Sequence, residues 1–390
     1  MLNTIRSYLK QNNIDAWVIY DFAATNPAYL RLIGNTFSTR KSFLIVSTVD
    51  APMLICHIID LPGIQKNSGP IQFTYKPYRT WQEMFDLLGN SLKNKNRIIM
   101  EVSHDGLMPR SSFADYGTVC LIKRFVNEIL PSADLFQLLT ATFDGDSLIL
   151  HRQAAAAIDK IKDEAFAKIS QDVRINGFSD EYDVQQFIFE RFRQENMVTD
   201  SAPIVAIGEN AISPHYEPTQ HQHSKIKPGD LVLIDLWAKY AIPNSVFADI
   251  TWMGFVGDTI PSKIQNVFDT VKTAIDHALS FLTSELPVRD VCGYEVDDVC
   301  NQYLRKQGYG NYIVHRTGHS ISPGDSDHGI GVNIDNFETH DTRHIINNVA
   351  FSLEPALYLP EFGLREEINV YIQNRQPYVY TPRQNKILLL

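Results

Sequence analysis

The first third of the chain alternates short apolar runs with segments of helical periodicity. Four β-prone apolar runs bounded by polar or turn residues predict buried strands at residues 16–20, 43–47, 52–56 and 97–100. Helical periodicity predicts helices over residues 81–92 and 111–121. This order of elements indicates a smaller α/β domain over residues 1–145, in which no catalytic cluster is recognisable.

The remainder of the chain carries longer helical segments separated and followed by β-type segments. The turn FDGDS at residues 143–147 marks the expected domain boundary. Helices are then predicted over residues 148–174, 261–282 and 288–307, from their apolar spacing and from the Pro and Gly residues that bound them. The hairpins between and after them predict an α+β domain with an antiparallel sheet over residues 146–390.

The length and net charge of the chain indicate how many domains it has and which binding partners are not expected. A chain of 390 residues has room for two domains. Its net charge of −10 would repel a phosphate backbone, so no nucleic-acid partner is expected. No apolar run approaches the ~18 residues of a membrane span, and polar residues interrupt the first 20 positions where a signal peptide would need an apolar core. We therefore expect a cytoplasmic protein without membrane contact.

Two aspartates interrupt an otherwise apolar predicted hairpin, LVLIDLWAKYAIPNSVFADITW at residues 231–252. Asp235 and Asp249 are equally distant from position 242, next to the Pro243-Asn244 turn, so they should lie roughly opposite each other on one face, where opposed residues have Cβ atoms ~5 Å apart. Ionised carboxylates this close in apolar strands need protons or a cation. A metal ion is the simplest solution, and the alternative is that one aspartate is a surface residue at a strand end.

A second predicted hairpin, AFSLEPALYLPEFGLREEINVYI at residues 350–372, repeats this geometry with glutamates. The midpoint of Glu354 and Glu367 falls within the turn at residues 360–363, so the two glutamates should face each other. Strand alternation points the adjacent Glu366 to the other face. Arg365 shares the face of Glu367 and could hold it by charge-assisted hydrogen bonds.

Between the two hairpins, the segment YIVHRTGHSISPGDSDHGIGVNI at residues 312–334 supplies His315, His319 and His328. Four carboxylates and one imidazole form a hard, oxygen-rich donor set, which favours Mn²⁺, with Co²⁺ or Zn²⁺ as alternatives. Four carboxylates over-supply one cation but suit two divalent metal ions ~3.5–4 Å apart, which can activate a water molecule.

The chain order Asp, Asp, His, Glu, Glu resembles the metal signature of the pita-bread metallopeptidases, which include methionine aminopeptidase, aminopeptidase P and prolidase. The resemblance covers residues 150–380 and implies these metal ligands: Asp235, Asp249, His319, Glu354 and Glu367. It implies a pita-bread domain over residues 146–390. Less specifically, residues 1–145 are similar to the creatinase-type N-terminal domain of the prolidase and aminopeptidase P branch. The residues that carry this weaker likeness are Tyr29, Leu30, Gly34 and Arg40.

The same resemblance implies a reaction and roles in it. The implied activity is metal-dependent hydrolysis of the Xaa-Pro bond at the amino terminus of short peptides, as an Xaa-Pro dipeptidase or an aminopeptidase P. Glu354 would relay the proton of the attacking water and Arg365 would support the site. His215, in GENAISPHYEP, would bind substrate or shuttle a proton, and His328 would stabilise the oxyanion. Members of the family are often homodimers, so a homodimer is expected.

Several positions depart from the family pattern and leave alternatives open. Trp237 stands where the family usually has Gly, and the segment between Asp235 and Asp249 is longer than usual. The family's Gly-His-Gly-Ile-Gly is split here, so a second register would make His328 the metal ligand instead of His319. Two other functions share this architecture: a metal-free creatinase-like amidinohydrolase and a non-catalytic binding protein. Retention of all five ligand residues argues against both.

Overall fold

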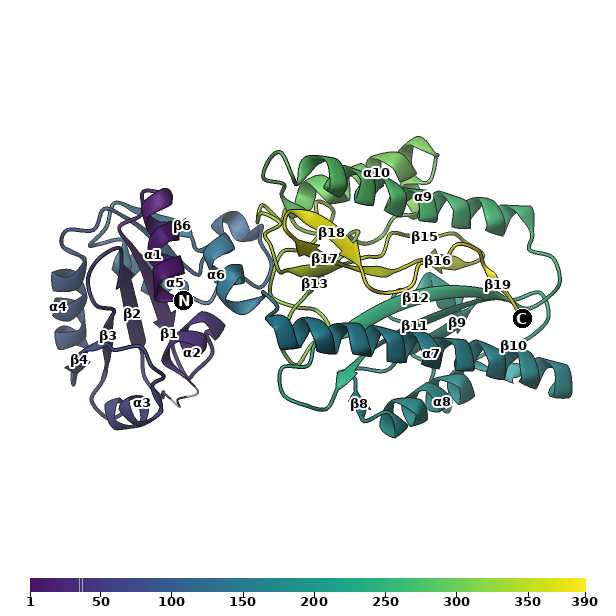
Figure 1. Ribbon diagram of the computed structural model, residues 1–390, viewed down its shortest axis with the longest axis horizontal. Helices are drawn as coiled ribbons and strands as arrows, with labels where there is room; N and C mark the ends of the chain where they lie inside the picture. The colour runs from purple at the N-terminus through teal and green to yellow at the C-terminus, as the bar shows by residue number, and fades with distance from the viewer. Residues whose placement is uncertain (35, 37) are drawn as a thin grey trace. The chain divides into compact units, whose positions relative to one another are not determined.

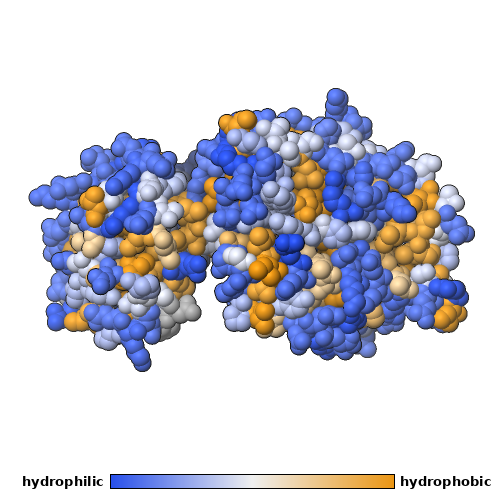
Figure 2. Space-filling model, viewed as in Figure 1, coloured by the Kyte–Doolittle hydropathy of each residue, from blue (hydrophilic) through white to orange (hydrophobic). Residues whose placement is uncertain are grey.

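The computed structural model describes residues 1–34, 36 and 38–390, which form two compact units, Met1–Thr140 and Ala141–Leu390 (Figure 1). The division lies just before the FDGDS turn at residues 143–147, where the sequence predicts a boundary. Among the residues described, no helix combines the length and the apolar character that a membrane span requires. Figure 2 shows hydrophilic residues distributed over the visible face of both units.

The N-terminal unit is built on one mixed six-stranded sheet in the order β4-β3-β2-β1-β5-β6. Strands β1, β2 and β3 pair antiparallel, and the other neighbours pair parallel. The strands are β1 (Ala16–Asp21), β2 (Ser42–Ser47), β3 (Met53–His57), β4 (Thr74–Tyr78), β5 (Arg97–Met100) and β6 (Glu128–Pro131). The helices are α1 (Leu2–Gln11), α2 (Pro27–Ile33), α3 (Leu61–Asn67), α4 (Trp81–Leu92), η1 (His104–Gly106), α5 (Tyr116–Ile122) and α6 (Ala133–Thr140).

The sequence located four of these strands and helix α4, but the helix expected over residues 111–121 was placed too early. Helix α5 begins at Tyr116 because the Asp115 carboxylate accepts the Thr118 backbone N–H at 2.8 Å and caps the helix there.

The C-terminal unit contains two larger sheets covered by long helices, and their strands pair antiparallel except for the parallel pair of β12 and β19. The helical segments are α7 (Gly145–Asn176), α8 (Glu181–Gln194), η2 (Asn210–Ile212), α9 (Ser262–Glu285), α10 (Gly293–Lys306) and η3 (Gly310–Tyr312). The strands that carry the sheets are β8 (Met197–Val198), β9 (Ile204–Ile207), β11 (Leu231–Tyr240), β12 (Ala248–Phe255), β13 (Ser320–Ile321), β14 (Ala350–Leu353), β17 (Ile368–Gln373), β18 (Gln376–Val379) and β19 (Leu388–Leu389). Shorter pairs are formed by β7 (Ser179–Asp180), β10 (Lys225–Ile226), β15 (Ala356–Tyr358) and β16 (Gly363–Arg365).

Alternation along β11 divides this unit into two cores. Val232, Ile234 and Leu236 pack against α7, whereas Leu233 packs in the core shared with α9 and α10. Figure 1 shows α7 and α8 on one side of the sheets and α9 and α10 on the other. Because Asp235 shares the period of Leu233, its side chain points into the space between the two sheets.

The register of the first hairpin differs from the predicted one by two residues. Asp235 pairs with Thr251, and Asp249 pairs with Trp237, so the two aspartates are diagonal neighbours and not opposed. The predicted pairing, which centres the hairpin on position 242, is therefore two residues out of register. The Ser245 N–H donates to Ile242 O at 3.3 Å and Asn244 has a φ of 61°. These are features of a type II turn that centres the hairpin beyond position 242. A displacement of two residues keeps both aspartates on one face.

The second hairpin has the predicted register. Leu353 pairs with Ile368 in the ladder of β14 and β17, and Ala356 pairs with Arg365 in the ladder of β15 and β16. This register sets Glu354 across from Glu367 in the gap between the two ladders. Their backbone N–H groups bond elsewhere, to Thr317 O at 2.7 Å and to Thr251 O at 3.2 Å, which ties the hairpin to its neighbours.

Candidate metal centre

The five residues expected to bind metal line a single cavity of about 670 Å³ in the C-terminal unit. Asp235 and Asp249 come from β11 and β12, and both are buried. Glu354 follows β14, Glu367 precedes β17, and His319 immediately precedes β13. Residues more than 130 positions apart in the chain therefore meet in one pocket.

His319 is oriented with one ring nitrogen toward the carboxylates. Its Nε2 lies 3.5 Å from Asp249 Oδ2 and 3.4 Å from Glu354 Oε1. Nδ1 lies 3.2 Å from Ser320 O, and assigning the proton to Nδ1 leaves the Nε2 lone pair facing the acids. Ligand atoms of Asp249, His319 and Glu367 all lie within 4.8 Å of one another. This grouping suits the coordination shell of one cation.

Arg365 pairs with a different carboxylate from the one expected. Its guanidinium contacts Asp235, and its Nε donates to Thr251 Oγ1 at 3.0 Å. The Thr251 hydroxyl in turn donates to Glu367 Oε2 at 3.0 Å. The expected direct bond from Arg365 to Glu367 is thus replaced by a link through Thr251, because the guanidinium lies closer to the acid on β11.

Most of the clustered carboxyl groups are hard to ionise without a cation. Burial raises the pKa of Asp249, and the charge of Asp235 raises it further. Burial likewise raises the pKa of Glu367, with Asp249 as the next cause, and burial also raises that of Asp235 despite its pairing with Arg365. Glu354 is the exception: burial opposes its ionisation, but the neighbouring His319, among other groups, lowers its pKa to about 2.

Three carboxylate oxygens in this cluster are buried without a hydrogen-bond partner among the described residues. They are Asp235 Oδ1, Asp249 Oδ1 and Glu367 Oε1. Buried polar atoms left unpaired cost free energy, and charged ones cost more. Divalent cations accept oxygen donors of this kind together with a single imidazole. The residues therefore fit a metal centre.

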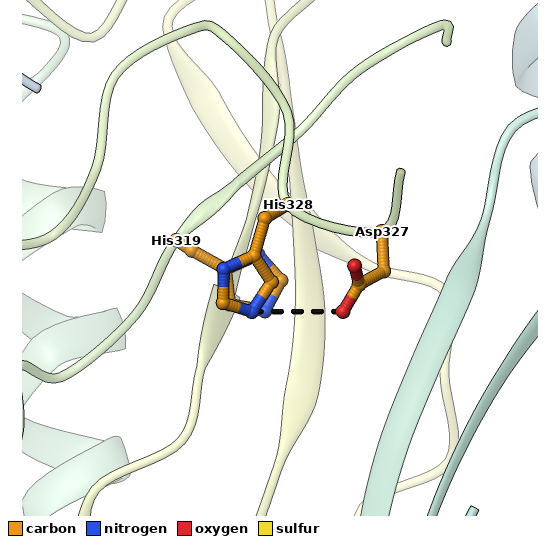
Figure 3. Close-up of side chains that lie close together, drawn as sticks. All are labelled: His319, Asp327 and His328. Atoms are coloured by element: carbon orange, nitrogen blue, oxygen red, sulfur yellow. Dashed lines mark ion pairs between the residues drawn. The ribbon is translucent and has the colours of Figure 1, made fainter. Parts of the chain in front are cut away.

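The two further histidines expected at the site also line the cavity. His215 is exposed at its rim. His328 stacks on His319 with ring centroids 3.8 Å apart, and its Nε2 lies 3.5 Å from Asp327 Oδ2 (Figure 3). Burial, together with the charge of His319, lowers the pKa of His328 to about 3, so its ring is neutral at physiological pH.

His319, Asp327 and His328 form a second group whose ligand atoms lie within 4.8 Å of one another. The alternative in which His328 is a metal ligand is therefore also compatible with the geometry. Both groups use His319. The group with Asp249 and Glu367 is the fully buried one, and it contains two of the three unpaired oxygens.

Sequence reasoning missed several residues of the pocket. Thr251 could have been found, because strand alternation places it on the same face as Asp249. Asp327 lines the cavity beside His328, and Tyr358, outside the cavity lining, has its OH 2.8 Å from Nε2 of the lining residue His315. The positions of Asp327 and Tyr358 depend on contacts between distant segments, so no local pattern in the sequence indicates them.

Known proteins share both sequence and fold with the chain. The sequence model described as metallopeptidase family M24 matches residues 150–374. An Xaa-Pro dipeptidase of Lactobacillus delbrueckii subsp. lactis is 27% identical over 55% of this chain and 54% of the relative. An Xaa-Pro dipeptidase of Pyrococcus furiosus is 27% identical over 47% and 48%. The chain thus spans about half the length of these relatives. The crystal structure of the prolidase from Pyrococcus horikoshii OT3 superposes with a TM-score of 0.62 at 19% identity, over 99% of both chains.

Proposed function

The chain belongs to metallopeptidase family M24, with its pita-bread fold, and we propose that it hydrolyses the Xaa-Pro bond at the amino terminus of short peptides in a reaction that needs two divalent metal ions. The observation that carries this proposal is the set of buried carboxylate oxygens without partners in the cavity. The Xaa-Pro specificity is supported by the names of the relatives that match the chain.

Five residues would hold the cations: Asp235, Asp249, His319, Glu354 and Glu367. Mn²⁺ suits the four carboxylates best, with Co²⁺ or Zn²⁺ as alternatives. Bound cations supply Lewis-acid chemistry, which acidifies a water molecule and polarises the scissile carbonyl.

The protein's own groups would handle protons and orientation. Glu354, ionised at neutral pH because of its low pKa, would accept the proton of the attacking water at its carboxylate and relay it to the leaving amine. Arg365 would hold Asp235 in place. His328 is neutral, so it retains one ring N–H that can donate to the developing oxyanion. His215, exposed at the rim, would contact the substrate.

The test is hydrolysis of Xaa-Pro dipeptides and Xaa-Pro-Yaa tripeptides by protein stripped of metal and then supplied with Mn²⁺, Co²⁺ or Zn²⁺. We expect cleavage at the Xaa-Pro bond only after metal is restored, and the preferred length will separate dipeptidase from aminopeptidase activity. No turnover with any metal would favour a binding protein. Metal-independent hydrolysis of creatine would favour the amidinohydrolase. The cytoplasmic location and the homodimer remain predictions.

A further inference from the structure

The wall of the cavity beside β11 is built by residues that the metal centre does not use. The indole N–H of Trp237 donates to Asp200 Oδ1 at 2.9 Å, and the backbone N–H of Asp327 donates to Asp200 Oδ2 at 3.3 Å. Lys239 on the same strand donates to Gly324 O and lies 3.2 Å from Asp325 Oδ1. The main chain of this loop is therefore held against β11, which fixes where the Asp327 side chain can point.

The Asp327 carboxylate faces the cavity without a positive partner. Its side chain is 13% exposed, and Oδ1 accepts only a neutral donor, the Ser326 hydroxyl at 3.2 Å. No Lys or Arg within the described part of the chain reaches it at ion-pair distance, and a second carboxyl group, that of Asp200, lies beside it. A largely buried carboxylate of this kind is stabilised by a cation.

The distance from the metal centre limits which part of a substrate could supply that charge. The Asp327 ligand oxygen lies within 4.8 Å of the ring nitrogen of His319. In a peptide, the α-nitrogen of the first residue is two bonds from the first carbonyl carbon, or about 2.5 Å, whereas each further residue adds about 3.3–3.6 Å. If the first carbonyl is the one attacked beside His319, the ammonium group of the same residue falls near Asp327.

We propose that Asp327 binds the positively charged amino terminus of the substrate and so restricts cleavage to the first peptide bond. This inference rests on the proposed peptidase function. It assigns specificity to a residue outside the expected metal ligands, in the loop that splits the family's glycine-rich motif. The same carboxylate chemistry could instead take a metal ion together with His328, and the experiment distinguishes the two sources of positive charge.

The experiment compares Asp327→Asn with the wild-type protein, both loaded with Mn²⁺, on an Xaa-Pro peptide and on its des-amino analogue as a competitive inhibitor. We expect the KM of the peptide to rise roughly 10- to 100-fold, as for loss of a hydrogen bond to a charged group, with a smaller change in kcat. The inhibition constant of the des-amino analogue should stay the same, because it carries no charge for Asp327 to bind. Asp327→Glu should recover part of the loss.

Asp258→Asn is the control for the loss of one negative charge, since Asp258 is exposed and lies outside the loop that carries Asp327. It should leave the KM unchanged. The proposal is overturned if Asp327→Asn weakens peptide and analogue equally, if it weakens neither, or if the variant loses a bound metal ion by elemental analysis. Absence of turnover in the wild-type protein would instead contradict the peptidase function itself.

Discussion

A buried glutamate in each unit shows two ways in which the protein accommodates a carboxylate. Glu101 in the N-terminal unit is 1% exposed, and Glu367 in the C-terminal unit is 2% exposed. Glu101 accepts hydrogen bonds from Trp17 Nε1 at 2.6 Å and from Asn26 Nδ2 at 2.7 Å. Glu367 accepts one from Thr251, and its other oxygen has no partner among the described residues.

The difference lies in the neighbours rather than in the burial. Burial raises the pKa of Glu101 to about 7, while its hydrogen bonds oppose the shift. For Glu367, burial is reinforced by the charges of three other carboxylates: Asp249, Glu354 and Asp235. Neutral donors can satisfy one buried acid, but a group of four repels itself and needs positive charge. Arg365 supplies one charge, against Asp235, and we propose that bound cations supply the remainder.

The strongest test of this difference is Glu354→Gln, which removes the carboxylate that stays ionised. The amide keeps the shape and can still accept the Ser352 hydroxyl, now 3.0 Å from Glu354 Oε1. We expect turnover to fall roughly 10²- to 10⁴-fold, the usual contribution of a general base, with the fold intact. Steady-state kinetics and circular dichroism measure the two properties. A fully active variant would remove Glu354 from the proton-relay role.

Asp249→Ala tests whether the cluster binds metal. The variant should lose at least one metal ion by elemental analysis, together with the stabilisation that wild-type protein gains from Mn²⁺, about 2.7 kcal/mol at a concentration 100 times the Kd. Without metal it should lose little stability, because one of several repelling carboxylates is gone. The exposed Asp258→Ala provides a control with unchanged metal content. Unchanged metal content in Asp249→Ala would exclude Asp249 as a ligand.

The two hairpins show which features the alternation of side chains along a strand can predict and which it cannot. The register that sets Glu354 opposite Glu367 was predictable because their hairpin is symmetric about its turn. The other register was missed by two residues because Pro243 and Asn244 occupy the central positions of the turn. The error did not move a side chain to the other face, since the period of a strand is two. Which face each acid occupies was thus predictable even where its partner was not.

Contacts between distant segments could not be predicted from the sequence. Arg365 contacts Asp235, which lies 130 positions away in the chain. The contact forms because the packing of the sheets places Asp235 on β11 beside the guanidinium. The position of Asp327 depends on Asp200 and Trp237, which lie on other segments of the unit. Local periodicity carries no information on such pairs, because they are decided by how the sheets and loops pack.

The pH dependence of stability tests whether Glu101 in the N-terminal unit behaves differently from the carboxyl groups of the metal centre. The folded-state pKa of Glu101 is raised from 4.5 to about 7, so its favourable contribution is present below pH 4.5 and is lost as the pH rises through 7. The loss is roughly 3 kcal/mol at 1.36 kcal/mol per pKa unit. Glu101→Gln should show a flatter decline of Tm between pH 5 and pH 8 than the wild-type protein, whether or not Mn²⁺ is present.

The exposed Asp86→Asn controls for a change of net charge in the same unit. A slope of Tm against pH that is identical in Glu101→Gln and wild-type protein would show that Glu101 ionises freely in the fold. A slope that Mn²⁺ removes would mean that the acids of the metal centre cause it.

The smallest effect is expected from substitution of Thr251, whose hydroxyl donates a hydrogen bond to Glu367. Thr251 is fully buried and also accepts the Arg365 Nε–H. Thr251→Val keeps the shape but removes both bonds, so Glu367 should be less well oriented. We expect a roughly tenfold loss of Mn²⁺ affinity by calorimetry, the lower end for residues that orient metal ligands. Thr251→Ser retains the hydroxyl and should bind Mn²⁺ like the wild-type protein. Equal losses in Val and Ser variants would mean that packing of the Thr251 methyl group, and not its hydroxyl, supports the centre.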